Sequence, residues 1–132
     1  ADKTIWIDCD VIQADGGTRT AAITGSFVEL YQAVKRMQAE RLLIKNPITA
    51  YVAAVSVGKV NDRIILDLNY PEDSSAEVDL NVVMTDQGKF IEIQGTAEAK
   101  PFSDQDLNEM ISIAKQGIGE LVRIQKQVIT AL

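Results

Sequence analysis

The residues from Gly16 to Thr20 combine several groups that favour the binding of phosphate. Gly16 and Gly17 let the backbone approach an anion closely. They separate a strand-like run from a helix-like run, and the free N–H groups and dipole of a helix start attract negative charge. Thr18 adds a hydroxyl donor and Arg19 a planar, permanently charged fork. The alternative is an ordinary turn in which Thr18 caps the helix and Arg19 is solvated. On spacing alone we favour that turn.

A second stretch carries a cluster of acidic residues, Glu72, Asp73, Glu77 and Asp79. Two carboxylates can hold one Mg²⁺ that also contacts a substrate phosphate. An extended chain would separate Asp73 from Asp79 by about 20 Å, so the chain must bend near Asp73 for both to reach one ion. The alternative is an acidic turn followed by a solvated strand face, which we favour on the cluster alone. Repulsion between such dense like charges argues for a bound cation.

Composition limits the kinds of chemistry that the chain can perform. It has 132 residues, 46% hydrophobic and 24% charged, which predicts one compact domain over residues 1–132. The absence of histidine excludes Ser–His and Cys–His nucleophilic sites, so a metal would be held by carboxylates, which suits Mg²⁺ or Mn²⁺. A net charge of −6 predicts poor binding of RNA by this chain alone.

Two features bear on the cellular location: the single cysteine, and the length and pattern of the apolar runs. Cys9 lies in an apolar stretch, which predicts a buried thiol in a reducing cytoplasm. No run has the length of a membrane span and the start does not have the pattern of a secretion signal, so we expect no membrane association. The chain does not begin with methionine, and we expect it to be a piece of a longer protein.

The positions of apolar residues predict an alternating order of strands and helices. Residues 4–13 form a buried strand with Trp6 in the core, and residues 18–43 form a helix whose buried stripe includes Phe27 and Val34. Ser103 begins a last helix that runs to residue 130, with Asp106 in a capping-box position. Between the two helices we expect strands at 50–57, 64–68, 77–85 and 90–96, joined by turns at 58–62, 71–75 and 86–88. This order indicates an α+β fold with helices on one face of a mixed β-sheet.

Three longer stretches resemble the ribonuclease PH family. They are residues 8–20, residues 72–85, and residues 92–98 followed by the pair Pro101-Phe102. The resemblance runs from about Thr4 to the end of the chain. It reverses the preference for an ordinary turn at Gly16 to Thr20 and for a solvated face around Asp79, because these are long, family-specific stretches.

The resemblance implies a fold like domain 2 of ribosomal protein S5 and a phosphorolytic 3′–5′ exoribonuclease. Such enzymes use inorganic phosphate as co-substrate, require Mg²⁺, process tRNA 3′ ends as well as rRNA, release nucleoside diphosphates and assemble as a hexameric ring of dimers. The family's phosphate site matches Gly17, Thr18 and Arg19. Its carboxylates that hold the metal or assist transfer match Asp73 and Asp79.

The resemblance also implies a first half that this chain does not contain. That half would supply basic residues and much of the RNA-binding surface, which accounts for the acidity of this chain. It would be a missing segment or a companion chain, and without it we expect aggregation or self-association. Two alternatives remain: a non-catalytic scaffold subunit of an exosome-type ring, and an isolated half that assembles with itself. Retention of Asp73, Asp79, Thr18 and Arg19 favours the active enzyme.

Overall fold

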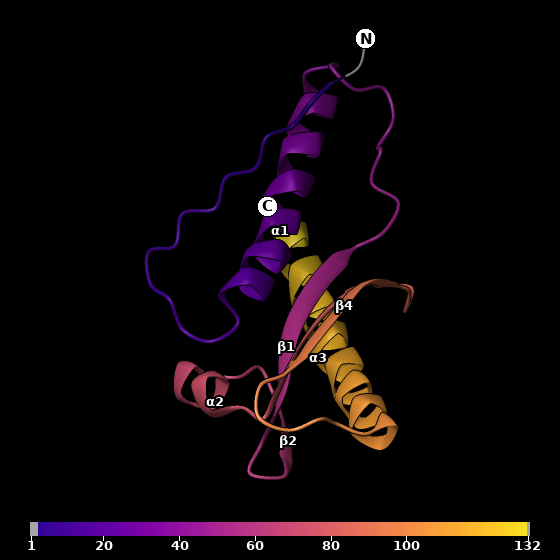
Figure 1. The fold of residues 1–132 in the computed structure, drawn as a ribbon. Helices are drawn as coiled ribbons and strands as arrows, with labels where there is room; N and C mark the ends of the chain where they lie inside the picture. The colour runs from indigo at the N-terminus through magenta and orange to yellow at the C-terminus, as the bar shows by residue number, and fades with distance from the viewer. Residues whose placement is uncertain (1–2, 132) are drawn as a thin grey trace.

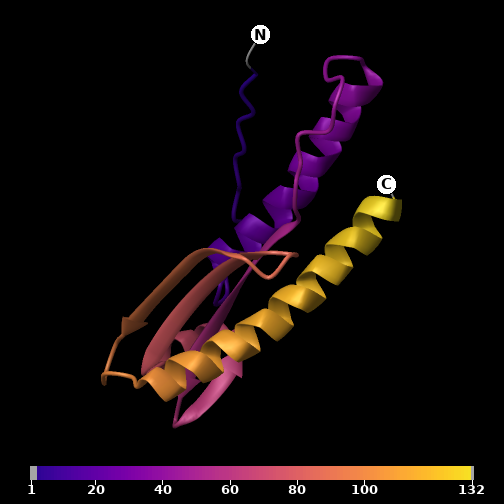
Figure 2. The ribbon, with the colours of Figure 1, turned by 90° about the vertical axis from the view of Figure 1, so that its right-hand side faces the viewer.

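A four-stranded antiparallel sheet is the centre of the fold, with the strand order β2-β1-β3-β4. The computed structural model describes residues 3–131. The two long helices contact each other, and both contact β1 (Figures 1 and 2). In chain order the elements are α1 (Thr18–Ala39), β1 (Val52–Val60), β2 (Arg63–Leu66), α2 (Tyr70–Ser75), β3 (Val78–Thr85), β4 (Phe90–Ala97) and α3 (Asp104–Ala131). The α+β arrangement is therefore as predicted.

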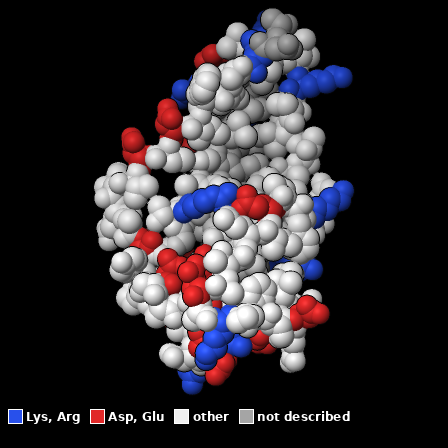
Figure 3. All heavy atoms as spheres, viewed as in Figure 1, with Lys and Arg blue, Asp and Glu red and all other residues white. Residues whose placement is uncertain are grey.

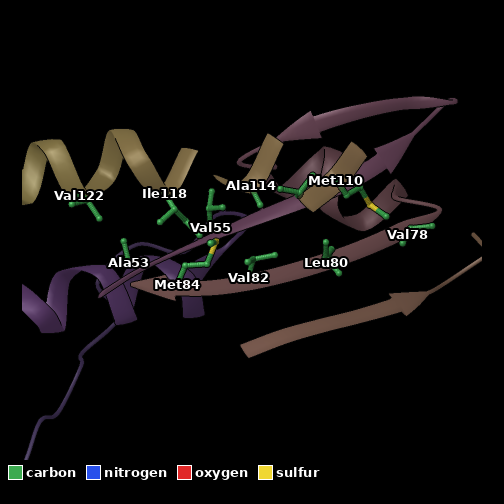
Figure 4. Close-up of a cluster of buried hydrophobic side chains, with 11 residues drawn as sticks. Ala53, Val55, Val78, Leu80, Val82, Met84, Met110, Ala114, Ile118 and Val122 are labelled. Carbon is green, nitrogen blue, oxygen red and sulfur yellow. The ribbon is translucent and has the colours of Figure 1, made fainter. Parts of the chain in front are cut away.

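The main core lies between α3 and one face of the sheet. Alternate residues of β1 and β3 point toward the helix, because side chains of a strand alternate between its two faces (Figure 4). On α3 the buried residues recur every four positions, which places them on one side of the helix. The buried residues of this core are Ala53, Val55, Val57, Val78, Leu80, Val82, Met84, Met110, Ala114, Ile118 and Val122.

Side chains from both long helices satisfy the edge of β1 that β2 does not cover. The Thr24 hydroxyl of α1 accepts from the Ala54 N–H at 3.0 Å and donates to the Ala54 carbonyl at 3.1 Å. Gln125 of α3 donates its amide N–H groups to the carbonyls of Thr24 and Val52, each at 2.9 Å. These contacts replace a neighbouring strand, and they fix α1 beside the sheet.

The sequence prediction for residues 4–13 is wrong. The segment makes no strand, and Trp6 and Ile12 are 88% and 99% exposed instead of buried. Cys9 is also exposed, with its Sγ 3.1 Å from the Ser26 Oγ on α1. No sheet edge among residues 3–131 pairs with this segment, so its apolar side chains stay in solvent. For the same reason the sheet is antiparallel throughout instead of mixed.

A helix end and a predicted turn also differ from the structure. Helix α1 ends at Ala39 instead of residue 43, because Arg41 adopts a left-handed backbone (φ 60°) and the Leu42 N–H donates back to the Met37 carbonyl. The stretch 71–75, predicted as a turn, is the short helix α2. Its capping box joins Asn69 and Glu72, each side chain accepting from the backbone N–H of the other.

Candidate functional site

The sheet face turned away from α3 carries polar side chains, and we call it the polar face. Strand pairing places Asn81 opposite Ser56, Asp79 opposite Gly58, and Glu92 opposite Val83 on this face. Along each strand these positions alternate with the core residues, which point to the opposite face. The polar face therefore carries Ser56 of β1, Asp79 and Asn81 of β3, and Glu92 of β4 on the same side of the sheet.

The turn before α1 is attached to the segment that leads into α2. A Cβ on Gly16 would lie 2.0 Å from the Leu68 carbonyl oxygen, so only glycine fits there. The Asp15 carboxylate accepts from the backbone N–H groups of Tyr70 and Gly16, and these bonds lower the pKa of Asp15. The predicted anion turn and the helix that carries Asp73 are thus held next to each other.

The first turn of α1 is open. Gly17 is the N-cap residue with a left-handed backbone (φ 68°), it supplies no side-chain cap, and the turn contains no acidic residue. Within the part of the chain that the structure describes, no acceptor meets the backbone N–H groups of Thr18, Arg19 and Thr20. The Thr18 hydroxyl donates to the Asp15 carbonyl at 2.9 Å, so its hydrogen stabilises the turn. The backbone donors are the groups available to an anion.

Arg19 extends across the polar face to β4. Its Nη1 and Nη2 donate to the two Glu92 carboxylate oxygens at 2.7 and 2.9 Å. The bidentate contact raises the pKa of Arg19 and lowers that of Glu92. Sequence reasoning named Arg19 but missed Glu92, because 73 residues separate the two in the chain.

Ser56 is a second residue that the sequence did not indicate. The residue is 2% exposed, and among the described residues no hydrogen-bond partner meets its hydroxyl. A Cβ placed on Gly17 would lie 3.0 Å from the Ser56 Oγ, so this hydroxyl stands at the start of α1. A buried polar group without a partner is costly, so Ser56 is a second feature, besides the open N–H groups, that marks the start of α1 as a candidate polar site.

Asp79 lies in a cluster of carboxylates that differs from the one predicted. Burial raises the pKa of Asp79, and the charges of Asp73 and then Glu98 raise it further. Its Oδ2 accepts from the Asn81 amide at 3.2 Å, while its buried Oδ1 has no partner in the described chain. The charge of Glu98 thus acts on Asp79, whereas the Glu72 carboxylate is used in the capping box of α2.

The two sequence candidates thus meet at one side of the molecule. The chain between Asp73 and Asp79 turns back after α2, which brings the Asp73 charge near Asp79. In the view of Figure 3 several acidic side chains form one group, with basic side chains above and below it, and other acidic side chains are scattered over the same face. Among residues 3–131 no group of three or more acidic or cysteine side chains is arranged to hold a metal ion by itself. A cation at Asp79 would need ligands from elsewhere, such as a substrate phosphate or water.

Residues 50–117 match the model of the 3′ exoribonuclease family, domain 2. The chain belongs to this family. Its matched region contains β1 to β4, α2 and the first half of α3, and therefore both Asp73 and Asp79. The fold and the family resemblance predicted from the sequence are confirmed.

Two relatives are called ribonuclease PH. The protein of Bacillus pumilus (strain SAFR-032) is 56% identical over 128 residues, which are 96% of this chain and 53% of the relative. The protein of Syntrophomonas wolfei subsp. wolfei (strain DSM 2245B / Goettingen) is 55% identical over 128 residues, 97% of this chain and 54% of the relative. The chain therefore spans about half the length of the curated relatives it matches.

Neither the two long helices nor α2 combine the length and apolar character that crossing a bilayer requires, within residues 3–131.

Proposed function

We propose that this chain is the C-terminal half of a phosphorolytic 3′–5′ exoribonuclease that trims the 3′ ends of tRNA. The proposal is supported by the ribonuclease PH relatives and by one observation above all. The open start of α1, with Arg19 beside it, is attached through Asp15 to the segment that carries Asp73 near Asp79. An anion site and a carboxylate pair next to each other suit phosphoryl transfer, which depends on positioning and charge stabilisation.

The backbone N–H groups of Thr18 and Arg19 and the Arg19 guanidinium would hold inorganic phosphate, with Gly17 allowing its close approach. An oxygen of this phosphate attacks the phosphorus of the last phosphodiester bond. The bond from phosphorus to the 3′ oxygen of the preceding nucleotide breaks, and a nucleoside diphosphate leaves. The leaving 3′ oxygen takes up a proton, either from the attacking phosphate or from Asp79, whose raised pKa suits a general acid.

Asp73 and Asp79 would hold Mg²⁺ or Mn²⁺. The fit is supported by the unpaired Asp79 Oδ1 and by the mutual repulsion of the two carboxylates, which a cation relieves. A divalent cation supplies charge neutralisation at the scissile phosphate. Asp79 would act either as a ligand of the cation, together with Asp73, or as the general acid that protonates the leaving 3′ oxygen. Both roles place it at the leaving oxygen.

The remaining parts of the proposal concern the intact protein. A first half, as a preceding segment or companion chain, would supply the basic surface for RNA that a chain of net charge −6 does not offer. Residues 1–132 would act as one domain of a hexameric ring of dimers. We place the protein in the reducing cytoplasm, where its one cysteine stays a thiol.

The test combines this chain with the first half of a ribonuclease PH relative and supplies a tRNA precursor, Mg²⁺ and phosphate. We expect nucleoside diphosphates whose release requires phosphate. Arg19→Ala and Asp79→Asn should each lower the rate by about 100-fold or more, because each removes charge stabilisation at the reacting groups. Arg123→Ala on α3, whose side chain pairs with Glu120 away from the polar face, is the control. Monophosphate products would contradict phosphorolysis, and an assembled but inactive complex would favour the scaffold alternative.

A further inference from the structure

The Arg19 guanidinium already has a carboxylate partner in the structure. Glu92 occupies both Nη groups, with contacts of 2.7 and 2.9 Å, and its carboxylate has no other hydrogen bond in the described part of the chain. This end-on geometry uses the same pair of donors with which arginine binds phosphate. A phosphate at the start of α1 must therefore displace Glu92 or share the guanidinium with it.

The strand position of Glu92 explains how its carboxylate reaches Arg19. It stands on β4 opposite Val83, so it projects from the polar face on the far side of β3 from α1. Arg19 is held across that face by the contact, with side chains of Arg19 and Glu92 53% and 35% exposed. An exposed pair of this kind is weak enough to exchange, since water screens the attraction.

We propose that Glu92 sets the anion specificity of this site by competing for the Arg19 guanidinium. The inference rests on the proposed function, which supplies phosphate as the ligand. Glu92 holds the guanidinium over the polar face in the absence of ligand. An anion replaces it only if it carries more charge than a carboxylate and also binds the open N–H groups of α1, beside which the unpartnered Ser56 hydroxyl lies. Phosphate meets these conditions, and a monocarboxylate does not.

The test measures the dissociation constant of inorganic phosphate for the full 132-residue chain by calorimetry at constant ionic strength. Glu92→Gln removes the competing charge and keeps the side-chain shape, and we expect phosphate to bind about three- to tenfold more tightly. Glu120→Gln is the matched control, because Glu120 makes a bidentate pair with Arg123 on α3. We expect its affinity for phosphate to equal that of the wild type.

A double-mutant cycle separates competition at Arg19 from a general effect of charge. In Arg19→Ala the further change Glu92→Gln should bring no gain, because there is no guanidinium to release. A gain of the same size in both backgrounds would overturn the inference, as would unchanged or weaker binding in Glu92→Gln. Acetate binding should rise in Glu92→Gln as well, since the competing carboxylate is gone.

The outcomes also distinguish this inference from the proposed function. Phosphate binding that depends on Arg19 but not on Glu92 would leave the proposed site in place and remove the role of Glu92. Absence of phosphate binding in both the wild type and Glu92→Gln would overturn the anion site itself, and the inference with it.

Discussion

Asp79 is held where its charge is unfavourable. Burial and the neighbouring charges of Asp73 and Glu98 raise its pKa, so the folded state binds a proton there more readily than the unfolded chain does. The free energy of unfolding therefore falls as the pH rises from the unfolded pKa of about 3.8 through the higher folded value. At neutral pH the Asp79 carboxylate destabilises the fold, a cost that suits the role proposed for it at the reacting groups.

Asp79→Asn should therefore raise the melting temperature at neutral pH by a few degrees. The gain should vanish well below pH 3.8, where Asp79 of the wild type is protonated in both states. Differential scanning calorimetry over this pH range checks both parts. Glu109→Gln, an exposed substitution on α3 that also removes one negative charge, should leave the melting temperature nearly unchanged. A lower melting temperature in Asp79→Asn would contradict the unfavourable environment.

Sequence reasoning named its candidate residues through the resemblance to the ribonuclease PH family, since their type and spacing alone favoured an ordinary turn and a solvated face. Gly17, Arg19, Asp73 and Asp79 belong to this group. It missed Ser56, since a small hydroxyl within an apolar strand predicts a core position and only the fold leaves it unpartnered beside Gly17. Glu92 and Glu98 were missed for a related reason. Their partners come from distant parts of the chain, and a sequence pattern contains no information on such pairs.

At the scale of elements, the Thr24 hydroxyl is one of the groups that fix α1 beside the edge of β1. We expect Thr24→Val to cost about 1–3 kcal/mol, because valine keeps the shape but leaves the Ala54 N–H and carbonyl without their partner. Urea unfolding measures the loss, and hydrogen exchange should show a faster Ala54 amide. Thr130→Val, at an exposed position near the end of α3, is the control. An unchanged Ala54 exchange rate would mean that another group satisfies this edge.

The start of α3 predicts a dependence of stability on acid. Asp106 accepts from the backbone N–H and hydroxyl of Ser103, and its Oδ1 lies 3.0 Å from the Lys59 Nζ on β1. The Ser103 backbone bond, followed by the Lys59 hydrogen bond, lowers the pKa of Asp106 from 3.8 to about 2. A lowered pKa stabilises the fold above the unfolded value, and the stabilisation is lost as the pH falls through the folded value.

Asp106→Asn should thus be less stable than the wild type at neutral pH, and the difference should shrink between about pH 4 and pH 2. Urea titrations at a series of pH values measure it. Asp62→Asn is the control, since Asp62 also contacts Lys59, but at 3.6 Å and with a largely exposed side chain. A difference that persists at pH 2 would assign the effect to helix capping instead of charge.

Elements with a continuous local pattern were predictable, and those that depend on a partner were not. The strand β3 and the helix α3 follow their alternation and four-residue spacing, and each begins within one residue of the prediction. For α2 the capping pair Asn69 and Glu72 was present in the sequence, but Pro71 and the serines around it are equally typical of turns. Residues 4–13 have the composition of a buried strand. Such a strand must pair with a sheet edge or pack against another apolar surface, and residues 3–131 provide no sheet edge that pairs with it.

On the scale of the whole molecule, the segment before α1 leaves several apolar side chains exposed. They are Ile5, Trp6, Ile7, Val11 and Ile12. Exposed apolar residues in one stretch indicate an interface. The relatives are about twice as long as this chain, so the proposed first half supplies enough protein to cover the segment.

Trp6 reports on this interface because it is the only tryptophan of the chain. In the chain alone, at low concentration, we expect the emission of a water-exposed indole, since Trp6 is 88% exposed. Adding the first half of a ribonuclease PH relative should shift the emission to shorter wavelength and saturate at one to one. Ile12→Asp should weaken this complex by about tenfold or more, because it places a charge in an apolar contact. Ile44→Asp, at a similarly exposed position after α1, should leave it unchanged. Equal weakening by both substitutions, or an emission that stays at long wavelength in a formed complex, would show that the first half binds elsewhere.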